Sequence, residues 1–118
     1  MLRGIRGAIT VEKNAKEDIW KAAQLLVTKT LSANGMNFDD IGAIIFSSTN
    51  DLTAAFPTTG LRQLPGFNMV PLFDTQQTNV EDSLERCIRV LILADMDKKS
   101  VEIHHIYLGD AKKLRPDL

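Results

Sequence analysis

The sequence predicts an α+β domain, and two periodic segments carry this prediction. Residues 2–11 alternate between two faces with a period of two, as a half-buried strand does. Apolar residues between Ile19 and Leu31 recur at helical spacing and form one stripe. Three further apolar runs have the length of strands, at residues 41–47, 69–73 and 101–108. The 118 residues suit one compact domain, which we expect to span residues 1–118.

The first strand places Arg6 between two small residues. Gly4, Arg6 and Ala8 share one face of residues 2–11, so space remains on either side of the guanidinium. Two interpretations stay open. The small residues either let a neighbouring element approach closely, or leave room for a ligand beside Arg6.

The helix after this strand has recognisable ends. We expect Asn14 to cap its N-terminus, with Glu17 three residues later as the partner in a capping box. Asn34 and Gly35 provide a left-handed stop. The apolar stripe between these ends is expected to be core and not a cofactor site.

The middle of the chain predicts a second, shorter helix. Pro57 suits the first position of a helix that reaches Leu64, and Pro65-Gly66 ends it. The polar residues 74–79 indicate a loop or an irregular strand end.

Residues 80–94 fit both a helix and a buried strand. We favour a strand over residues 87–94, which would then pair in a hairpin-like way with the strand at 101–108. A short helical turn is expected from Gly109 onward.

Arg89 is the most informative residue, because it lies in the longest apolar neighbourhood, residues 86–94. Arginine is almost never fully buried without a partner, and it cannot lose its proton. Arg89 must therefore reach an acidic side chain, extend to water, or bind an anionic ligand. The other basic residues favour an anion site too, because Arg3 and Arg6 lie in a strand-like segment whereas the lysines lie in polar surroundings.

The composition excludes several classes of protein. The chain has 44% apolar and 25% charged residues, as ordinary globular proteins do, and its net charge of −1 argues against a nucleic-acid partner. The lone Cys87 excludes an intramolecular disulfide and fits a reducing cytosol. We find no signal peptide and no apolar run of membrane-spanning length. We therefore expect a cytoplasmic protein with no membrane partner.

The sequence contains no metal or cofactor motif. His104 and His105 are adjacent on a strand-like segment, so their rings point to opposite faces and are not expected to share a metal. No Gly-rich phosphate loop, zinc-ligand spacing or nucleophile motif occurs. A domain of this size has little room for a deep private pocket, so we expect a substrate site on an edge or between subunits.

Five segments lie in an order and at a spacing that one known family shares. They are RGIRGAITVE at 3–12, DLTAAFP at 51–57, CIRV at 87–90, HIYL at 105–108 and LRPDL at 114–118. Together they resemble the AroH-class chorismate mutases from residue 2 to the C-terminus, and the match weakens at residues 74–79.

The resemblance implies a homotrimer whose subunits each contribute a mixed β-sheet to a pseudo-α/β barrel, with active sites between subunits. It implies an isomerase of phenylalanine and tyrosine biosynthesis that converts chorismate to prephenate by a Claisen rearrangement. It also implies no cofactor, no metal and no covalent intermediate. Chorismate is a dianion, and negative charge grows on its ether oxygen in the transition state. A fixed guanidinium would therefore stabilise the transition state more than the substrate.

Matching positions assign roles to individual residues by resemblance. Arg89 would face the ether oxygen and a substrate carboxylate, and Arg6 and Tyr107 would also bind carboxylate. Arg62 would lie at the entrance, and Arg115 belongs to a tail that would cover the site. The remaining walls of the pocket fall to Phe56, Thr58, Thr59 and Leu114.

Three positions depart from the family pattern. Gln77 replaces a glutamate that accepts a hydrogen bond from the substrate hydroxyl and pairs with the catalytic arginine. Asp74 replaces a cysteine, and Thr59 replaces a lysine. One hypothesis is that Asp74 restores the missing carboxylate and pairs with Arg89. The other is that Asp74 is a solvated residue and Gln77 suffices.

Two alternative functions remain at this point. The chain could be a non-catalytic anion-binding or regulatory trimer in which the glutamate has been lost. It could also be a trimeric enzyme of similar fold that hydrolyses enamines or imines, where an arginine holds a carboxylate.

Overall fold

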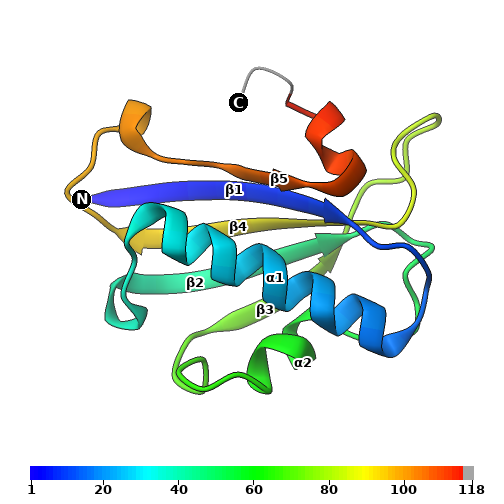
Figure 1. Ribbon diagram of the computed structural model, residues 1–118, viewed down its shortest axis with the longest axis horizontal. Helices are drawn as coiled ribbons and strands as arrows, with labels where there is room; N and C mark the ends of the chain where they lie inside the picture. Colours follow the sequence, from blue (N-terminus) through cyan, green and yellow to red (C-terminus); the bar gives the residue numbers. More distant parts are fainter. Residues whose placement is uncertain (116–118) are drawn as a thin grey trace.

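A computed structural model describes residues 1–115, which form one five-stranded sheet and two α-helices (Figure 1). The strands are β1 (Leu2–Thr10), β2 (Ile41–Ser48), β3 (Leu72–Gln76), β4 (Cys87–Asp95) and β5 (Ile106–Leu108). The helices are α1 (Lys16–Asn34) and α2 (Pro57–Arg62). Three 3-10 turns complete the described chain, η1 (Phe38–Asp40), η2 (Ser100–Glu102) and η3 (Gly109–Lys113).

The sheet is mixed, as expected, and its strand order is β3-β2-β4-β1-β5. The central strand β4 runs antiparallel to both β1 and β2. The two outer strands are parallel to their neighbours, β3 to β2 and β5 to β1. The predicted hairpin between the last two strands is therefore wrong, because β1 lies between them. Pairing β1 with both β4 and β5 joins the N-terminus to residues near the C-terminus.

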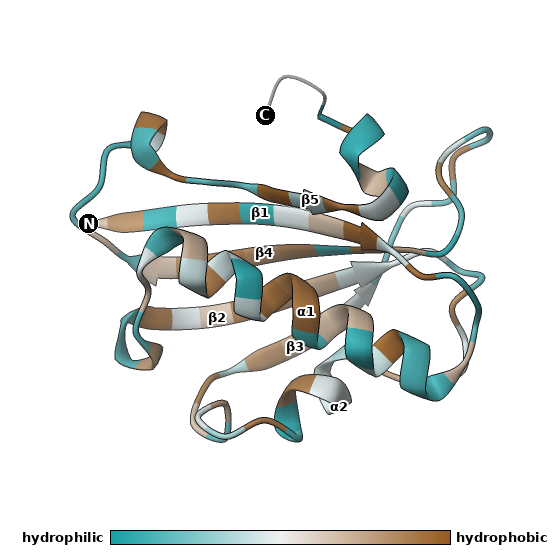
Figure 2. Cartoon of the chain, in the orientation of Figure 1, coloured by the Kyte–Doolittle hydropathy of each residue, from teal (hydrophilic) through white to brown (hydrophobic). Residues whose placement is uncertain are grey.

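Both helices cover the same face of the sheet (Figure 1). The predicted stripe on α1 is confirmed as core, since Ile19, Ala23, Leu26 and Val27 are all fully buried. They pack with buried residues of β1, β2 and β4, and the visible part of β4 is hydrophobic along most of its length (Figure 2). Within residues 1–115, no helix is long and apolar enough to cross a membrane.

Of the two ends predicted for α1, the C-terminal one is confirmed and the N-terminal one is not. Gly35 has φ 60°, and its N–H donates to carbonyls in the last turn, so the left-handed stop is confirmed. The predicted cap is wrong, because the N-cap residue is Ala15. Asn14 instead accepts hydrogen bonds from the backbone N–H groups of Thr53 and Ala54, each at 3.0 Å. It therefore ties down the loop after β2 and not its own helix.

Three further boundaries differ from the expectations. β3 begins at Leu72 and continues through Gln76, so part of the predicted loop is a strand. The segment before β3 is a loop, and its residues Phe67 and Val70 are buried in the core. The last strand contains only Ile106–Leu108, because residues 100–102 form η2. The helical turn expected from Gly109 is confirmed as η3.

The opposite face of the sheet carries neither α1 nor α2 (Figure 1), and η3 covers one part of it, where Ala111 packs with Ala8 and Cys87. Because side chains alternate along a strand, the residues that pair with one another across the sheet share a face. One row on this open face joins Phe73, Ile45, Leu91 and Arg6. Large apolar side chains are exposed there, since Phe73 is 63% and Leu2 is 69% accessible.

Candidate active site

Arg89 lies on the open face, at the middle of the sheet. It pairs with Ser47 of β2 on one side and with Ala8 of β1 on the other. Ala8 in turn pairs with Tyr107 of β5. The register of four strands therefore fixes one row across the sheet, and small side chains flank the guanidinium. Its neighbouring row, two residues along β1, contains Arg6.

A cavity of about 340 Å³ opens above these two rows. Arg6, Arg89 and Tyr107 line it from three different strands. Leu114 and Arg115 close one side of it from the segment after β5. The sequence assigned all five of these residues to the site, and the structure brings them together. Three guanidinium groups and a phenol beside apolar side chains suit a small, partly apolar anion.

The space beside Arg6 has a more specific origin than the sequence indicated. Gly4 lies outside the cavity, and the side chains of Leu91 and Leu93 pack at its position. Gly7, which points to the helix side, is the glycine that the fold requires. A Cβ there would lie 2.7 Å from the carbonyl oxygen of Ile106 and 3.1 Å from Leu26. It lets β5 and α1 approach β1 and so brings Tyr107 beside Arg6.

Two buried polar atoms on this face have no hydrogen-bond partner among the described residues. They are Nε of Arg89 and Oε1 of Gln77. Both side chains line a second opening that adjoins the cavity at Ser47. A buried donor and a buried acceptor without partners cost free energy unless a ligand satisfies them. A third such atom, Nε1 of Trp20, belongs to α1.

Within one chain, Asp74 does not pair with Arg89. Asp74 pairs across the sheet with the buried Phe46, so it points to the helix side, whereas Arg89 is on the open face. Its carboxylate accepts hydrogen bonds from the N–H and hydroxyl of Thr58, at 3.3 and 2.5 Å. Asp74 therefore holds the first turn of α2. Because residues 74–79 were predicted as a loop or an irregular strand end, the side of the sheet on which Asp74 lies could not be read from strand alternation.

Cys87 does not supply a counter-charge to Arg89 either. It lies two residues earlier on the same face of β4. Burial raises the pKa of its thiol above the ordinary 9.0, and the nearby Arg89 lowers that pKa by less. The thiol therefore stays protonated near neutral pH, and among residues 1–115 no carboxylate forms an ion pair with Arg89.

Besides Asp74, four of the predicted site residues lie away from the cavity. Phe56 is 67% exposed and lines a separate pocket with Asp74. Thr58, Thr59 and Arg62 belong to α2, which covers the helix side of the sheet. Arg62 donates a hydrogen bond from Nη1 to the carbonyl of Phe67 at 2.5 Å. Within one chain, the predicted residues thus form two groups on different faces.

His105 is a residue near the site that the sequence reasoning set aside. Its Nδ1 accepts a hydrogen bond from the backbone N–H of Arg6 at 3.0 Å, at the position just before β5 begins. Burial lowers the pKa of His105, and the cations Arg6 and Arg115 lower it further. His105 is therefore held neutral and continues the ladder between β1 and β5. The sequence did indicate its position, because strand alternation places His105 on the same face as Tyr107.

A mixed sheet with a cationic cavity on its open face defines this chain as a small-molecule-binding α+β protein. A family model for chorismate mutase type I matches residues 2–118. The chain is 46% identical over 119 residues to chorismate mutase AroH from Thermus thermophilus, covering 100% of this chain and 97% of the relative. It is 38% identical over 118 residues to chorismate mutase AroH from Bacillus subtilis (strain 168), covering 100% and 93%.

The fold agrees with that match. A solved structure of a chorismate mutase from Clostridium thermocellum superposes with a TM-score of 0.91 at 40% identity, covering 94% of this chain and 98% of that one. The chain therefore belongs to the chorismate mutase type I family.

Proposed function

We propose that this chain converts chorismate to prephenate by the [3,3] Claisen rearrangement. The observation that carries the proposal is the cavity on which Arg6, Arg89 and Tyr107 converge, in a member of this family. The reaction is unimolecular, so the protein must hold the flexible dianion in a reactive conformation and stabilise the charge that develops. Neither a purely regulatory role nor enamine hydrolysis is favoured by the family match.

In this proposal each group in the cavity has one task. Arg89 donates to the ether oxygen, where negative charge grows, and to a carboxylate. Arg6 and Tyr107 bind a carboxylate, and Leu114 and Arg115 limit access of water. The amide of Gln77 accepts a hydrogen bond from the ring hydroxyl. Support comes from the unpartnered Nε of Arg89 and Oε1 of Gln77, which are a donor and an acceptor left for a ligand.

We further propose that the active form is a homotrimer with sites between subunits, in the cytoplasm. The exposed apolar side chains on the open face, Phe73 among them, support assembly through that face. The separation of Phe56 and α2 from the cavity within one chain supports a site that two copies complete. In this assembly Phe56, Thr58, Thr59 and Arg62 of a second copy would form the remaining wall.

The direct test is the loss of chorismate absorbance in the presence of the protein, together with the appearance of prephenate. We expect turnover by the natural chain and a loss of about 3–4 kcal/mol of transition-state stabilisation in Arg89→Ala, which is several hundredfold in rate. Arg3→Ala is the matched control, because Arg3 donates to the carbonyl of Lys98 and to Ser100, away from the cavity. Absence of turnover by the natural chain would refute the proposal.

A further inference from the structure

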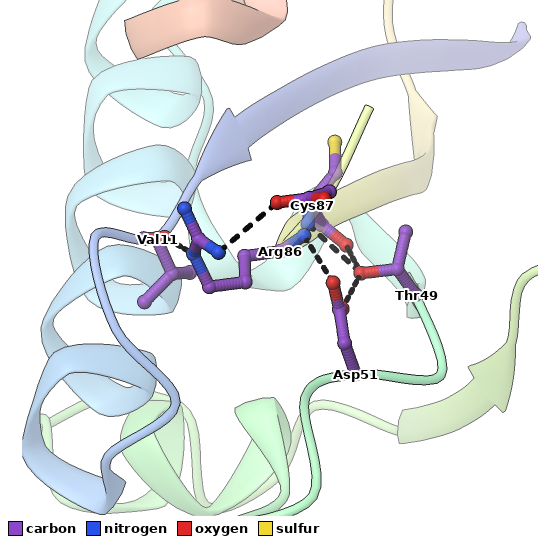
Figure 3. A network of polar contacts seen from close by, with 6 residues as sticks. Val11, Thr49, Asp51, Arg86 and Cys87 are labelled. Carbon is purple, nitrogen blue, oxygen red and sulfur yellow. Dashed lines mark hydrogen bonds and ion pairs between the residues drawn. The ribbon is translucent and has the colours of Figure 1, made fainter. Parts of the chain in front are cut away.

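The start of β4 is bound by a chain of side-chain oxygens from the end of β2 (Figure 3). Thr49 Oγ1 accepts a hydrogen bond from the backbone N–H of Cys87 at 3.0 Å and donates to Asp51 Oδ1 at 2.5 Å. Asp51 Oδ2 accepts from the backbone N–H of Arg86 at 2.9 Å. Two successive backbone donors are thus held by two linked side chains, which we call the Thr49–Asp51 clamp.

Arg86 is also bound from the opposite side, by Val11, and Cys87 is bound a second time by Thr49. The carbonyl of Arg86 accepts from the N–H of Val11 at 2.7 Å, and its Nε donates to the carbonyl of Val11 at 3.0 Å (Figure 3). The carbonyl of Cys87 accepts from the N–H of Thr49 at 3.0 Å. Residues 86 and 87 are therefore fixed between the ends of β1 and β2, just before the strand enters the site.

The conformation at Arg86 shows that this junction is enforced. Its φ is 45°, in the left-handed region that residues other than glycine seldom adopt. Such a conformation persists only when the surroundings determine it. The hydrogen bonds to its N–H, carbonyl and Nε are those surroundings. They turn the chain from the 77–86 loop into the line of β4.

Arg89 depends on this junction because no described acceptor orients its Nε. That atom is buried without a partner, and Asp74 lies on the other face. The thiol of Cys87 lies close to Arg89, so the residue held by the clamp is also one that Arg89 touches. In the ligand-free chain, the direction of the guanidinium therefore follows from the backbone of β4 and from its contact with the thiol of Cys87.

We propose that Thr49 and Asp51 are positioning residues for Arg89, acting through the backbone of Arg86 and Cys87 and the start of β4. The inference rests on the proposed function, in which Arg89 stabilises the transition state. Thr49 and Asp51 do not line the cavity of Arg6 and Arg89 themselves; they line a neighbouring pocket that also contains Gln77. A displacement of a catalytic group by about 1 Å costs on the order of 100-fold in rate.

Thr49 allows a pair of variants that differ only in the relevant atom. Thr49→Val keeps the shape of the buried side chain and removes the hydroxyl, whereas Thr49→Ser keeps the hydroxyl. We expect kcat to fall by about 10- to 100-fold in Thr49→Val, with a smaller change in KM, and to stay within about twofold of the natural value in Thr49→Ser. Asp51→Asn retains one carbonyl acceptor for two donors, so its loss should be intermediate.

A control separates positioning from general destabilisation. Ile19→Val removes one buried methyl group from α1, on the helix side, and should lower the melting temperature without lowering kcat. If Ile19→Val lowers kcat as much as Thr49→Val at an equal loss of melting temperature, the proposal is overturned. If Thr49→Val does not fold, the exposed Asp51 allows the same comparison with Asp51→Asn.

A second readout does not require turnover. The ¹⁵Nε–H resonance of Arg89, identified by its loss in Arg89→Lys, reports the surroundings of the guanidinium in the ligand-free protein. We expect it to shift or broaden in Thr49→Val and to remain unchanged in Thr49→Ser and Ile19→Val. An unchanged signal in Thr49→Val refutes the clamp even if the chain proves to lack chorismate mutase activity, which would refute only the proposed function.

Discussion

The two faces of the sheet use the same strands for opposite purposes. On the helix side, Ile5, Ile44 and Ile92 are fully buried against α1 and its neighbours, and the polar Asp74 is satisfied by Thr58. On the open face, the alternate residues include exposed Phe73 and Arg89, whose buried Nε has no hydrogen-bond partner among the described residues. Stability is therefore concentrated on one face, and the groups that need a partner lie on the other. Substitutions on the two faces should separate stability from activity.

The largest effect on the contrast between the two faces is expected from a charge placed on the open face, away from the cavity. Leu93→Glu introduces a charge beside Gly4, outside the cavity. If the open face is the subunit interface, we expect the mass in solution to fall from about three times 13.1 kDa to that of one chain, with loss of turnover. Sedimentation velocity measures the mass.

Val101→Glu is the control for that experiment, because Val101 is 90% exposed in η2. It should keep the mass and activity of the natural chain. A Leu93→Glu variant that stays assembled and active would show that the open face is not the interface.

The helix side should respond in the opposite way. Leu26 is fully buried, and its side chain packs against β1 beside Gly7. Leu26→Ala should lower the free energy of unfolding by about 3 kcal/mol, because it removes buried apolar contacts and leaves a cavity. Urea unfolding followed by circular dichroism measures this loss. The kcat of the folded fraction should be unchanged, and a large fall in kcat would contradict the separation of the faces.

A smaller effect on kcat is expected from substitutions of Gln77 and Asp74, and it tests which of the two supports the catalytic arginine. Gln77→Leu removes the buried Oε1 and should lower kcat about tenfold, which corresponds to roughly 1.4 kcal/mol for one hydrogen bond to substrate. Asp74→Asn keeps an acceptor for Thr58 and should lower kcat by less than about twofold. Steady-state turnover of chorismate compares them, and the reverse order would restore Asp74 as the partner of the catalytic arginine.

The smallest expected effect concerns pH. The pKa of His105 is lowered from its ordinary 6.5 by burial and by Arg6, Arg115 and His104, so the unfolded chain takes up a proton at a higher pH than the folded chain. The stability from neutral His105 is complete above pH 6.5 and is lost as pH falls through the lower folded pKa. Protonation would also remove the acceptor for the Arg6 N–H.

His105→Asn tests this dependence, because its amide oxygen can accept the same hydrogen bond and does not titrate. We expect the melting temperature of the natural chain to fall more steeply below pH 6.5 than that of His105→Asn. Parallel melting curves for the two proteins across this range would show that His105 stays unlinked to folding.

Local sequence patterns predicted the elements whose period is visible within one segment. The alternation in residues 2–11 and the stripe on α1 are local properties, and both are confirmed. The convergence of Arg6, Arg89 and Tyr107 followed from the family resemblance, and the register of β1, β4 and β5 explains it. The strand pairing could not be predicted from a local pattern, because β1 pairs with residues 77 to 93 positions away along the chain.

The errors arose where tertiary contacts override local preference. Asn14 has the right chemistry for a helix cap, but the loop at 53–54 offers it two backbone donors. Residues 69–73 were predicted to form a strand, yet Val70 fills the core from a turn, beside Phe67. The strand therefore begins three residues later, at Leu72, and within one chain Asp74 faces the helix side. The clamp at Arg86 had no sequence signal, since a positive φ at arginine follows from partners on other strands.

The shortness of β5 has a consequence for how the site behaves in time. Three residue pairs hold this edge strand to β1, whereas nine hold β4 to β1. An edge with so few bonds opens locally at lower free energy than the centre of the sheet, so the amides of 106–108 should exchange with deuterated water early. A ligand that contacts Tyr107 binds only the closed edge and slows this exchange by mass action. Occupancy of the cavity could therefore be followed from backbone exchange at β5 alone.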